Sequence, residues 1–176
     1  MNREGAIQIE QLDARQAQAD IPSLVLLLQD AVDSGASVGF LPPLEEQQAQ
    51  QFWQKIVADL AEGSRVLLVA RADGGIVGTV QLVLAGQPNA AHRAEVQRLL
   101  VHSRARRRGI GTQLMTAIEA VARQLRRTTL VLDTRLGDGS ETLYTKIGYT
   151  RAGTIPNYAR SADGTLHTTV LFYRLL

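Results

Sequence analysis

The chain has 176 residues, of which 45% are hydrophobic and 20% charged, a composition typical of a globular protein with one sizeable core. Its net charge of +2 is too small to mark a dedicated nucleic-acid-binding protein, and no apolar stretch is long enough to span a membrane. The absence of cysteine excludes disulfides and a thiol nucleophile, and three scattered histidines do not favour a metal site. Because residues 1–5 lack the form of a secretory signal, we expect a single cytoplasmic domain over residues 1–176.

The first half of the chain predicts an edge strand, two helices and a β-hairpin. Apolar residues recur at helical spacing over residues 21–32, and this helix is expected to end near Gly35. Pro42 and Pro43, followed by two glutamates, indicate the start of a second helix that ends at Gly63. The predicted strands of this half cover residues 6–12, 66–70 and 76–84, and a turn at residues 73–75 joins the last two.

The second half predicts a strand, a long amphipathic helix, a strand covered on both faces, a short helix and two final strands. Ser140 is the expected N-cap of the short helix, and Gly148 its C-terminal stop. The predicted elements cover about residues 93–101, 110–125, 129–132, 140–147, 149–153 and 170–173. This order predicts one α/β domain with a mixed, mostly antiparallel sheet of about seven strands and helices on both faces.

The segment between the predicted strand and the long helix is rich in arginine and glycine. A helix N-terminus presents free N–H groups and a partial positive charge, and glycine lets the backbone approach an anion closely. A Walker P-loop would need a lysine after Gly111, where this chain has Thr112, and a dinucleotide fingerprint would need a third glycine at Leu114. Contact of the arginines with nucleic acid is the alternative, but aromatic residues that would stack on bases are missing. We therefore predict that this turn binds the phosphate groups of a small-molecule cofactor.

The pattern Arg106-x-x-Gly109-x-Gly111 after an apolar strand resembles the pyrophosphate loop of the GNAT superfamily of N-acetyltransferases. The signature of that loop is Gln or Arg, two residues, Gly, one residue, and Gly or Ala. The order of the predicted elements is also similar, so the resemblance covers nearly the whole chain and implies a GNAT-like single domain. It implies that this turn binds the pyrophosphate of coenzyme A and that acetyl-CoA is the co-substrate. No metal is expected, because the three histidines are scattered. One departure is Gly137, seven residues before Tyr144, where many members carry an asparagine.

The predicted cofactor-binding residues combine the backbone of the strand, which would hydrogen-bond the pantetheine arm, with the turn that follows it. They are Leu99, Leu100, Val101, Arg106, Arg107, Arg108, Gly109, Ile110, Gly111 and Thr112.

Four segments are similar to the tabtoxin-resistance acetyltransferases, which acetylate a small amino-acid-like antimetabolite. They are residues 35–40, 93–97, 132–134 and 163–167. The resemblance implies an acceptor that is a small amine, such as an amino-acid-like antimetabolite or antibiotic. The loop at residues 35–40 either joins two helices with Phe40 in the core or contacts the substrate.

Three residues are candidates for catalysis. Glu95 lies among apolar strand residues, eleven before Arg106, a position similar to that of the glutamate base in GNAT histone acetyltransferases; otherwise it pairs with a neighbouring arginine. Asp133 ends the strand that is covered on both faces and would bind the substrate ammonium or share the role of base, unless it only caps a helix or a turn. Tyr144 resembles the family tyrosine that protonates the leaving thiolate, and otherwise is a core residue.

The function that these residues favour is acetyl-CoA-dependent N-acetyltransfer to a small-molecule amine by direct attack on the thioester. The alternative is a catalytically inactive acetyl-CoA-binding sensor or interaction module. No nucleic-acid or membrane partner is expected, and the chain is expected to be a monomer or a homodimer. The three histidines receive no role.

Overall fold

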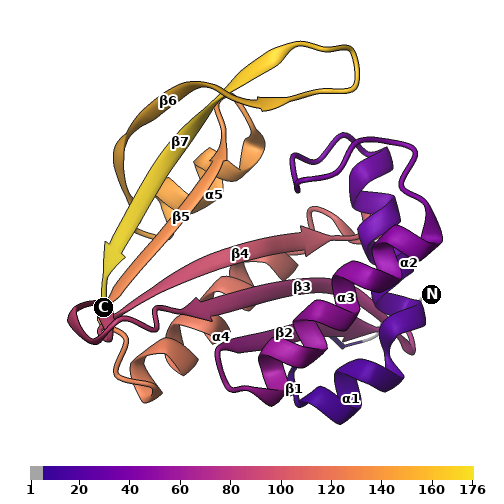
Figure 1. The fold of residues 1–176 in the computed structure, drawn as a ribbon, viewed down its shortest axis with the longest axis horizontal. Helices are drawn as coiled ribbons and strands as arrows, with labels where there is room; N and C mark the ends of the chain where they lie inside the picture. Colours follow the sequence, from indigo (N-terminus) through magenta and orange to yellow (C-terminus); the bar gives the residue numbers. More distant parts are fainter. Residues whose placement is uncertain (1–5) are drawn as a thin grey trace.

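The computed structural model describes residues 6–176, and residues 1–5, on which the expectation about a secretory signal rests, lie outside the described part. The described chain forms a seven-stranded sheet with helices on both faces, the α/β architecture that the sequence predicts (Figure 1). The strand order is β1-β2-β3-β4-β5-β7-β6, and β4 and β5 are the one parallel pair among the described strands. No helix within residues 6–176 has the length and apolar character that a membrane span requires.

The elements follow one another without a linker. The strands are β1 (Gln8–Leu12), β2 (Arg65–Ala72), β3 (Gly75–Leu84), β4 (Arg93–Val101), β5 (Thr129–Arg135), β6 (Thr150–Arg160) and β7 (Leu166–Leu175). The helices are α1 (Ala14–Ala19), α2 (Ile21–Asp33), α3 (Glu46–Ala61), α4 (Ile110–Gln124) and α5 (Gly139–Lys146), with short 3-10 turns at Pro88–Ala90 and Ser103–Ala105.

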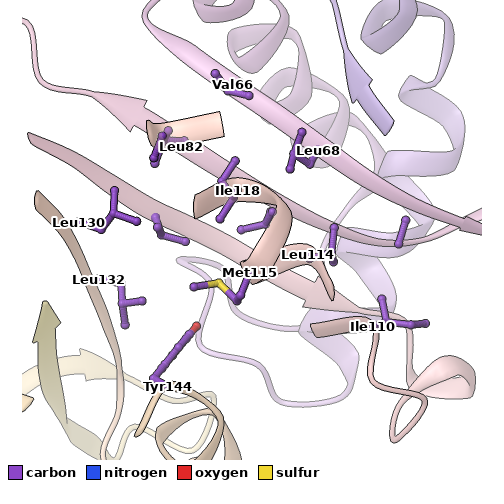
Figure 2. Close-up of a cluster of buried hydrophobic side chains, with 14 of the residues drawn as sticks. Val66, Leu68, Leu82, Ile110, Leu114, Met115, Ile118, Leu130, Leu132 and Tyr144 are labelled. Carbon is purple, nitrogen blue, oxygen red and sulfur yellow. The ribbon is translucent and has the colours of Figure 1, made fainter. Parts of the chain in front are cut away.

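Two apolar clusters hold the helices to opposite faces of the sheet. Side chains alternate along β2, so that Leu67 and Val69 pack under α2 and α3 while Val66 and Leu68 face α4. On α4, Ile110, Leu114 and Ile118 recur at helical spacing, as the sequence predicts, and all three are buried against the sheet (Figure 2). Burial on both faces explains why β2 and β3 are apolar along almost their whole length.

The structure corrects three details of the sequence prediction. Helix α1 was not expected, because its sequence is polar and only Ala17 is buried; an Asp13–Gln16 capping box begins it. The second predicted helix begins at Glu46 with Glu45 as its N-cap, and not at Pro42 and Pro43, which precede it.

The third correction concerns the short helix α5. Its N-cap is Asp138, whose side chain accepts a hydrogen bond from the Ser140 backbone N–H, and not Ser140 itself. The preceding Gly137 has a φ of +84°, a left-handed conformation that glycine and, less readily, asparagine adopt. The departure from the asparagine that many GNAT members carry therefore keeps a residue type compatible with this backbone.

The sheet opens between β4 and β5, and this opening positions the site. The two strands pair only from Arg93 opposite Thr129 to Glu95 opposite Val131, after which β5 continues with β7 and turns away from β4 (Figure 1). Beyond Glu95, the edge of β4 that faces β5 has no strand partner in the described chain. At the same point the register between β3 and β4 shifts, and Arg98 adopts a left-handed φ of 52°. A cleft thus enters the middle of the sheet.

Candidate active site

The turn between β4 and α4 has the geometry of an anion site. Gly109 is the N-cap in the left-handed conformation, with no side chain to cap the helix. The first amide that donates along the helix is that of Gln113, which bonds the Gly109 carbonyl at 3.1 Å. The N–H groups of the residues before it, Ile110, Gly111 and Thr112, have no carbonyl in the helix to bond and point out of its N-terminus.

Three arginines surround this turn. Arg106 and Arg107 are exposed, and Arg106 donates from Nε to the Val101 carbonyl at 3.3 Å. Arg108 is half-buried, with its guanidinium 3.9 Å from Asp73. Arg107 has a left-handed φ of 63°, which turns the chain sharply into the glycines. Positive charge and free amides therefore meet at the end of the open β4 edge, on which Leu99, Leu100 and Val101 lie.

A cavity of about 470 Å³ occupies the opening between β4 and β5. Its walls come from β4, from β5 and α5, from the loop after α2, and from the β6–β7 hairpin. All three candidate catalytic residues, Glu95, Asp133 and Tyr144, line it. The fold thus brings together three side chains that are far apart in the sequence, within a volume that suits a small molecule.

Glu95 is half-buried and fixed by a polar network on the α3 side of the sheet. Its Oε1 accepts a hydrogen bond from Gln97 Nε2 at 2.9 Å. Arg65 in turn donates to Gln97 at 3.3 Å and to Gln81 at 2.7 Å, and its ion pair with Asp59 at 2.9 Å fixes it. Glu95 makes no direct ion pair with Arg93 or Arg98 in the described chain, so that the simple pairing considered from the sequence does not occur. Its second carboxylate oxygen remains available to the cavity.

Asp133 lies near the end of β5, which extends to Arg135, one residue beyond the Asp133-Thr134 end expected from the sequence. Its Oδ2 accepts a hydrogen bond of 2.8 Å from the buried Thr169 hydroxyl, and Thr169 also bonds the Thr134 carbonyl. The carboxylate is exposed to the cavity. It caps neither a helix nor a turn, so the capping role considered from the sequence does not apply.

Tyr144 is only 6% exposed and belongs to the core as well as to the cavity wall. Its ring packs at 5.8 Å from Tyr149 and 5.9 Å from Phe172, and it extends from α5 toward Met115 (Figure 2). Burial, with smaller contributions from Asp138 and Asp133, raises the pKa of its hydroxyl, so Tyr144 is a protonated phenol at neutral pH. The core and catalytic interpretations of this residue are therefore compatible.

The loop after α2 also combines the two roles that the sequence leaves open. Phe40 packs on the helical cluster with its ring 5.4 Å from that of Phe52. Residues 36–39 line the 470 Å³ cavity, and a second cavity of about 580 Å³ lies between this loop and the tip of the β6–β7 hairpin. The segments 35–40 and 163–167, distant in the sequence, face each other across these cavities.

Sequence reasoning assigned no role to several polar residues of the cavity wall, among them Arg98, His167 and Thr169. His167 and Thr169 alternate along β7, and a polar residue in a final strand carries no sequence signal of its own. Arg98 resembles any other strand arginine in the sequence. Among residues 6–176, no group of three or more His, Asp or Glu side chains is placed to hold a metal ion.

Comparison with known proteins identifies the family of this chain. The profile of the Acetyltransferase (GNAT) family matches residues 27–149. An uncharacterized N-acetyltransferase from the hisH–hisA intergenic region of Azospirillum brasilense is 30% identical over 131 residues, which cover 73% of this chain and 76% of the relative. The chain therefore belongs to the GNAT family of acetyltransferases.

Solved structures share the fold at low sequence identity. A ribosomal-protein-alanine N-acetyltransferase from Brucella melitensis superposes with a TM-score of 0.80 at 22% identity, over 96% of this chain and 99% of that chain. The yncA protein from Salmonella typhimurium, a putative acetyltransferase solved with its cofactor acetyl-CoA, gives a TM-score of 0.79 at 17% identity, over 97% and 94% of the two chains. The GNAT-like fold expected from the sequence is thus confirmed.

Proposed function

We propose that this chain is an acetyl-CoA-dependent N-acetyltransferase whose acceptor is the amine of a small molecule, of the kind found in amino-acid-like antimetabolites. The observation that carries the proposal is the single cavity, in the opening between β4 and β5, which Glu95, Asp133 and Tyr144 line together. Membership of the GNAT family supports the class of reaction, and the family relative solved with acetyl-CoA supports the co-substrate.

The residues around the β4–α4 turn fit coenzyme A. The free amides of Ile110, Gly111 and Thr112, with Arg106 and Arg107 beside them, offer hydrogen bonds and positive charge to a pyrophosphate. The unpaired β4 edge offers backbone groups to an extended arm that carries amides, as a pantetheine does. When bound, acetyl-CoA would supply the activated acetyl group as a thioester.

Glu95 and Asp133 would prepare the acceptor. A lysine-like amine has a pKa of about 10.4 and is protonated at neutral pH, so it cannot attack until a proton leaves it. The Asp133 carboxylate, which the hydrogen bond from Thr169 holds in place, would attract the positively charged ammonium. Glu95, fixed through Gln97, would take the proton directly or through a water molecule.

Tyr144 would complete the proton balance. Its phenol keeps its proton at neutral pH because burial raises its pKa, and it is therefore equipped to donate that proton to a departing thiolate. Tyr144 lines the cavity and is only 6% exposed, and such low exposure strengthens a hydrogen bond from its hydroxyl to a developing negative charge.

The direct test is a panel of small amines incubated with purified protein and acetyl-CoA, with free thiol as the readout. Turnover of at least one amine is expected, and none across the panel would contradict the enzymatic proposal. A separate test of the acetyl-CoA site measures the thermal stability of the protein with and without each ligand. Acetyl-CoA at ~100 times its dissociation constant should stabilise the fold by about 2.7 kcal/mol, whereas ATP and NAD should not. Equal stabilisation by ATP would contradict the assignment of the β4–α4 turn.

A further inference from the structure

Arg98 lines the same cavity as Glu95 and Asp133, and its guanidinium has no carboxylate partner among residues 6–176. Its Nε is buried and has no hydrogen-bond partner among residues 6–176, and no carboxylate of those residues forms an ion pair with it. Its contact is with an aromatic ring: the guanidinium carbon lies 5.6 Å from the centre of Phe52. A cation–π contact leaves all the N–H donors of the guanidinium edge unused.

The backbone conformation of β4 places the Arg98 side chain beside Phe52. The left-handed φ of 52° at the β4 bulge is unfavourable for an arginine, and a strand without the bulge would send the side chain elsewhere. The hydrogen bond from Thr79 Oγ1 to the Arg98 carbonyl, 3.2 Å, holds the bulge. Gly39 approaches from the facing loop, and a Cβ there would lie 3.3 Å from Arg98 Nη2. A side chain at residue 39 would therefore crowd the guanidinium and displace it by a few tenths of an ångström.

A partly buried charge without a partner is costly, so its retention calls for a ligand. Burial, and then the positive charge of nearby Arg65, lower the pKa of Arg98, which shows that the protein itself stabilises this cation poorly. Asp133 and Glu95 act on Arg98 only through space. Among the residues that line the cavity, Glu95 and Asp133 thus act on Arg98 by charge, and Arg98 has no carboxylate partner of its own in the described chain.

We infer that Arg98 binds a carboxylate of the acceptor, so that the substrate is a small amino acid or a close analogue and not a simple amine. This inference rests on the proposed function, and it names the class of the acceptor. The ammonium would lie by Asp133 and Glu95, and the carboxylate by Arg98, which orients the amine in the cavity. The guanidinium carbon lies over the Phe52 ring, and a guanidinium edge carries two parallel N–H donors that match a carboxylate.

Arg135 also lines the cavity with a buried, unpartnered Nε, and it is the competing candidate. Its guanidinium already donates from Nη2 to Ser161 Oγ at 3.2 Å, toward the β6–β7 hairpin. Arg98 has no such bond in the described chain. The charges of Asp133 and Glu95 act on Arg98, which is therefore within range of an acceptor whose amine they hold.

The test compares acceptors that differ only in a carboxylate: L-lysine with cadaverine, L-ornithine with putrescine, and β-alanine with ethylamine. We expect the wild-type kcat/KM to favour the carboxylate-bearing member of the reactive pair. Arg98→Met should lower that ratio by about 10- to 100-fold, through the KM of the amino acid, and Arg98→Lys by less. Arg151→Met, a change of an exposed arginine on β6, should leave the ratio unchanged.

A wild-type enzyme without preference for either member would overturn the inference while leaving the proposed function intact. Loss of the preference in Arg135→Met but not in Arg98→Met would also overturn it. A second measurement does not need catalysis: succinate should raise the melting temperature of the wild type more than sodium chloride of equal ionic strength, and Arg98→Met should lose this shift. If no amine is turned over, a succinate shift that depends on Arg98 still supports the anion site, and its absence refutes it.

Discussion

Two arginines of this chain lie over aromatic rings, yet their surroundings differ. Arg174, on β7, lies 5.8 Å from the centre of Tyr149, donates to Glu119 on α4 at 3.0 Å and also bonds the Ile147 carbonyl. Arg98 lies over Phe52 at a similar distance, but makes no ion pair in the described chain. The Arg174 pair joins α4 to β7 on the core side of the sheet, whereas Arg98 faces the open cleft.

The contrast separates charges that hold the fold together from charges that serve a ligand. Glu119 is 6% exposed, and its partner satisfies it, so this pair is complete without any other molecule. Around the cleft, Glu95 has one oxygen unused, Asp133 faces the cavity, and Arg98 keeps its donors free. Substitutions on the two sides should therefore affect different quantities: stability at Arg174, and catalysis or specificity in the cleft.

The largest effect is expected for Glu95→Gln, which keeps the shape of the side chain and removes the proton acceptor. Turnover should fall by roughly 10²- to 10⁴-fold at neutral pH, and the deficit should shrink at high pH because the amine then loses its proton unaided. Steady-state rates across the pH range measure this. Glu10→Gln, at a half-exposed glutamate paired with Arg71 on the sheet edge, is the control. A normal pH–rate profile in Glu95→Gln would contradict the assignment.

Asp133→Asn separates the two carboxylates. If Asp133 mainly holds the ammonium, the KM of the acceptor rises and kcat changes little. If both carboxylates share the proton through a water molecule, each single substitution is costly and the double variant is less than multiplicatively worse.

The second prediction compares Arg174→Met with Arg98→Met in denaturant unfolding. Loss of Arg174 leaves the Glu119 carboxylate buried without its partner and should cost about 2–4 kcal/mol, below the upper range for buried pairs because Arg174 keeps 26% of its side chain exposed. Arg98→Met removes a charge without a partner and should leave stability within about 1 kcal/mol or raise it. Similar losses of stability in both variants would contradict the distinction between an arginine that stabilises the fold and one that binds a ligand.

Acidification sharpens that comparison. Burial raises the pKa of Glu119 above its ordinary 4.5 even with Arg174 present. The folded state then binds this proton more tightly than the unfolded state, so the contribution of Glu119 to stability improves as pH falls through its folded pKa. In Arg174→Met the pKa rises further, and the deficit relative to the wild type should shrink on acidification. Arg98→Met should show no such recovery.

The third prediction uses two tyrosines of the same core cluster. Tyr144→Phe should lower turnover roughly 10- to 1000-fold with little change in acetyl-CoA affinity, because only the proton donor is lost. Tyr149 is the matched control: its ring is 5.8 Å from that of Tyr144, and it is buried, but it does not line the cavity. Tyr149→Phe should therefore leave turnover unchanged. A loss of stability without a loss of turnover in Tyr144→Phe would assign that residue to packing alone.

Local patterns were sufficient to predict the fold. Helix α4 buries one face, and strands β2, β3 and β5 bury one or both faces. Because buried positions are apolar, each element shows the spacing of apolar residues that its structure requires. Helix α1 has no such period, since one alanine is its only buried residue. The N-cap of α5 could not be decided either, because Asp138 and Ser140 are both capping residues and only the backbone selects between them.

The site could be predicted only in part, for a different reason. Glu95 and Tyr144 occur in motifs that a family resemblance makes visible, and their roles stay predictions. Arg98 depends on a bulge, on Phe52 from a distant helix and on the missing side chain of Gly39. The bulge depends on the pairing of β4 with β3, and Phe52 and Gly39 are far from Arg98 in the sequence. No pattern along β4 therefore indicates the position of Arg98.

The smallest effect is expected at Asp30, which ties the helical layer to the β4–α4 turn. From α2 its carboxylate accepts hydrogen bonds from the Ser103 backbone N–H at 2.7 Å and the Ser103 hydroxyl at 2.6 Å, with His102 Nδ1 at 3.3 Å. Ser103 begins the 3-10 turn that leads into Arg106. Asp30→Asn should cost about 1 kcal/mol of stability and raise the KM of acetyl-CoA a few-fold, without a change in kcat.

The pH dependence of stability distinguishes the hydrogen bonds of Asp30 with Ser103 from a general effect of the lost charge. Burial alone would raise the pKa of Asp30, but the hydrogen bonds from Ser103 outweigh it and hold the pKa below the ordinary 3.8. Such a carboxylate contributes stability above its unfolded pKa and loses that contribution as pH falls through its folded pKa. The difference between wild type and Asp30→Asn should therefore be constant near neutral pH and close below about pH 3.8. Asp33→Asn, at an exposed position of the same helix, is the control and should change neither stability nor the KM of acetyl-CoA. Equal effects of the two substitutions would show that the negative charge of α2, and not the hydrogen bonds of Asp30 with Ser103, orders the turn.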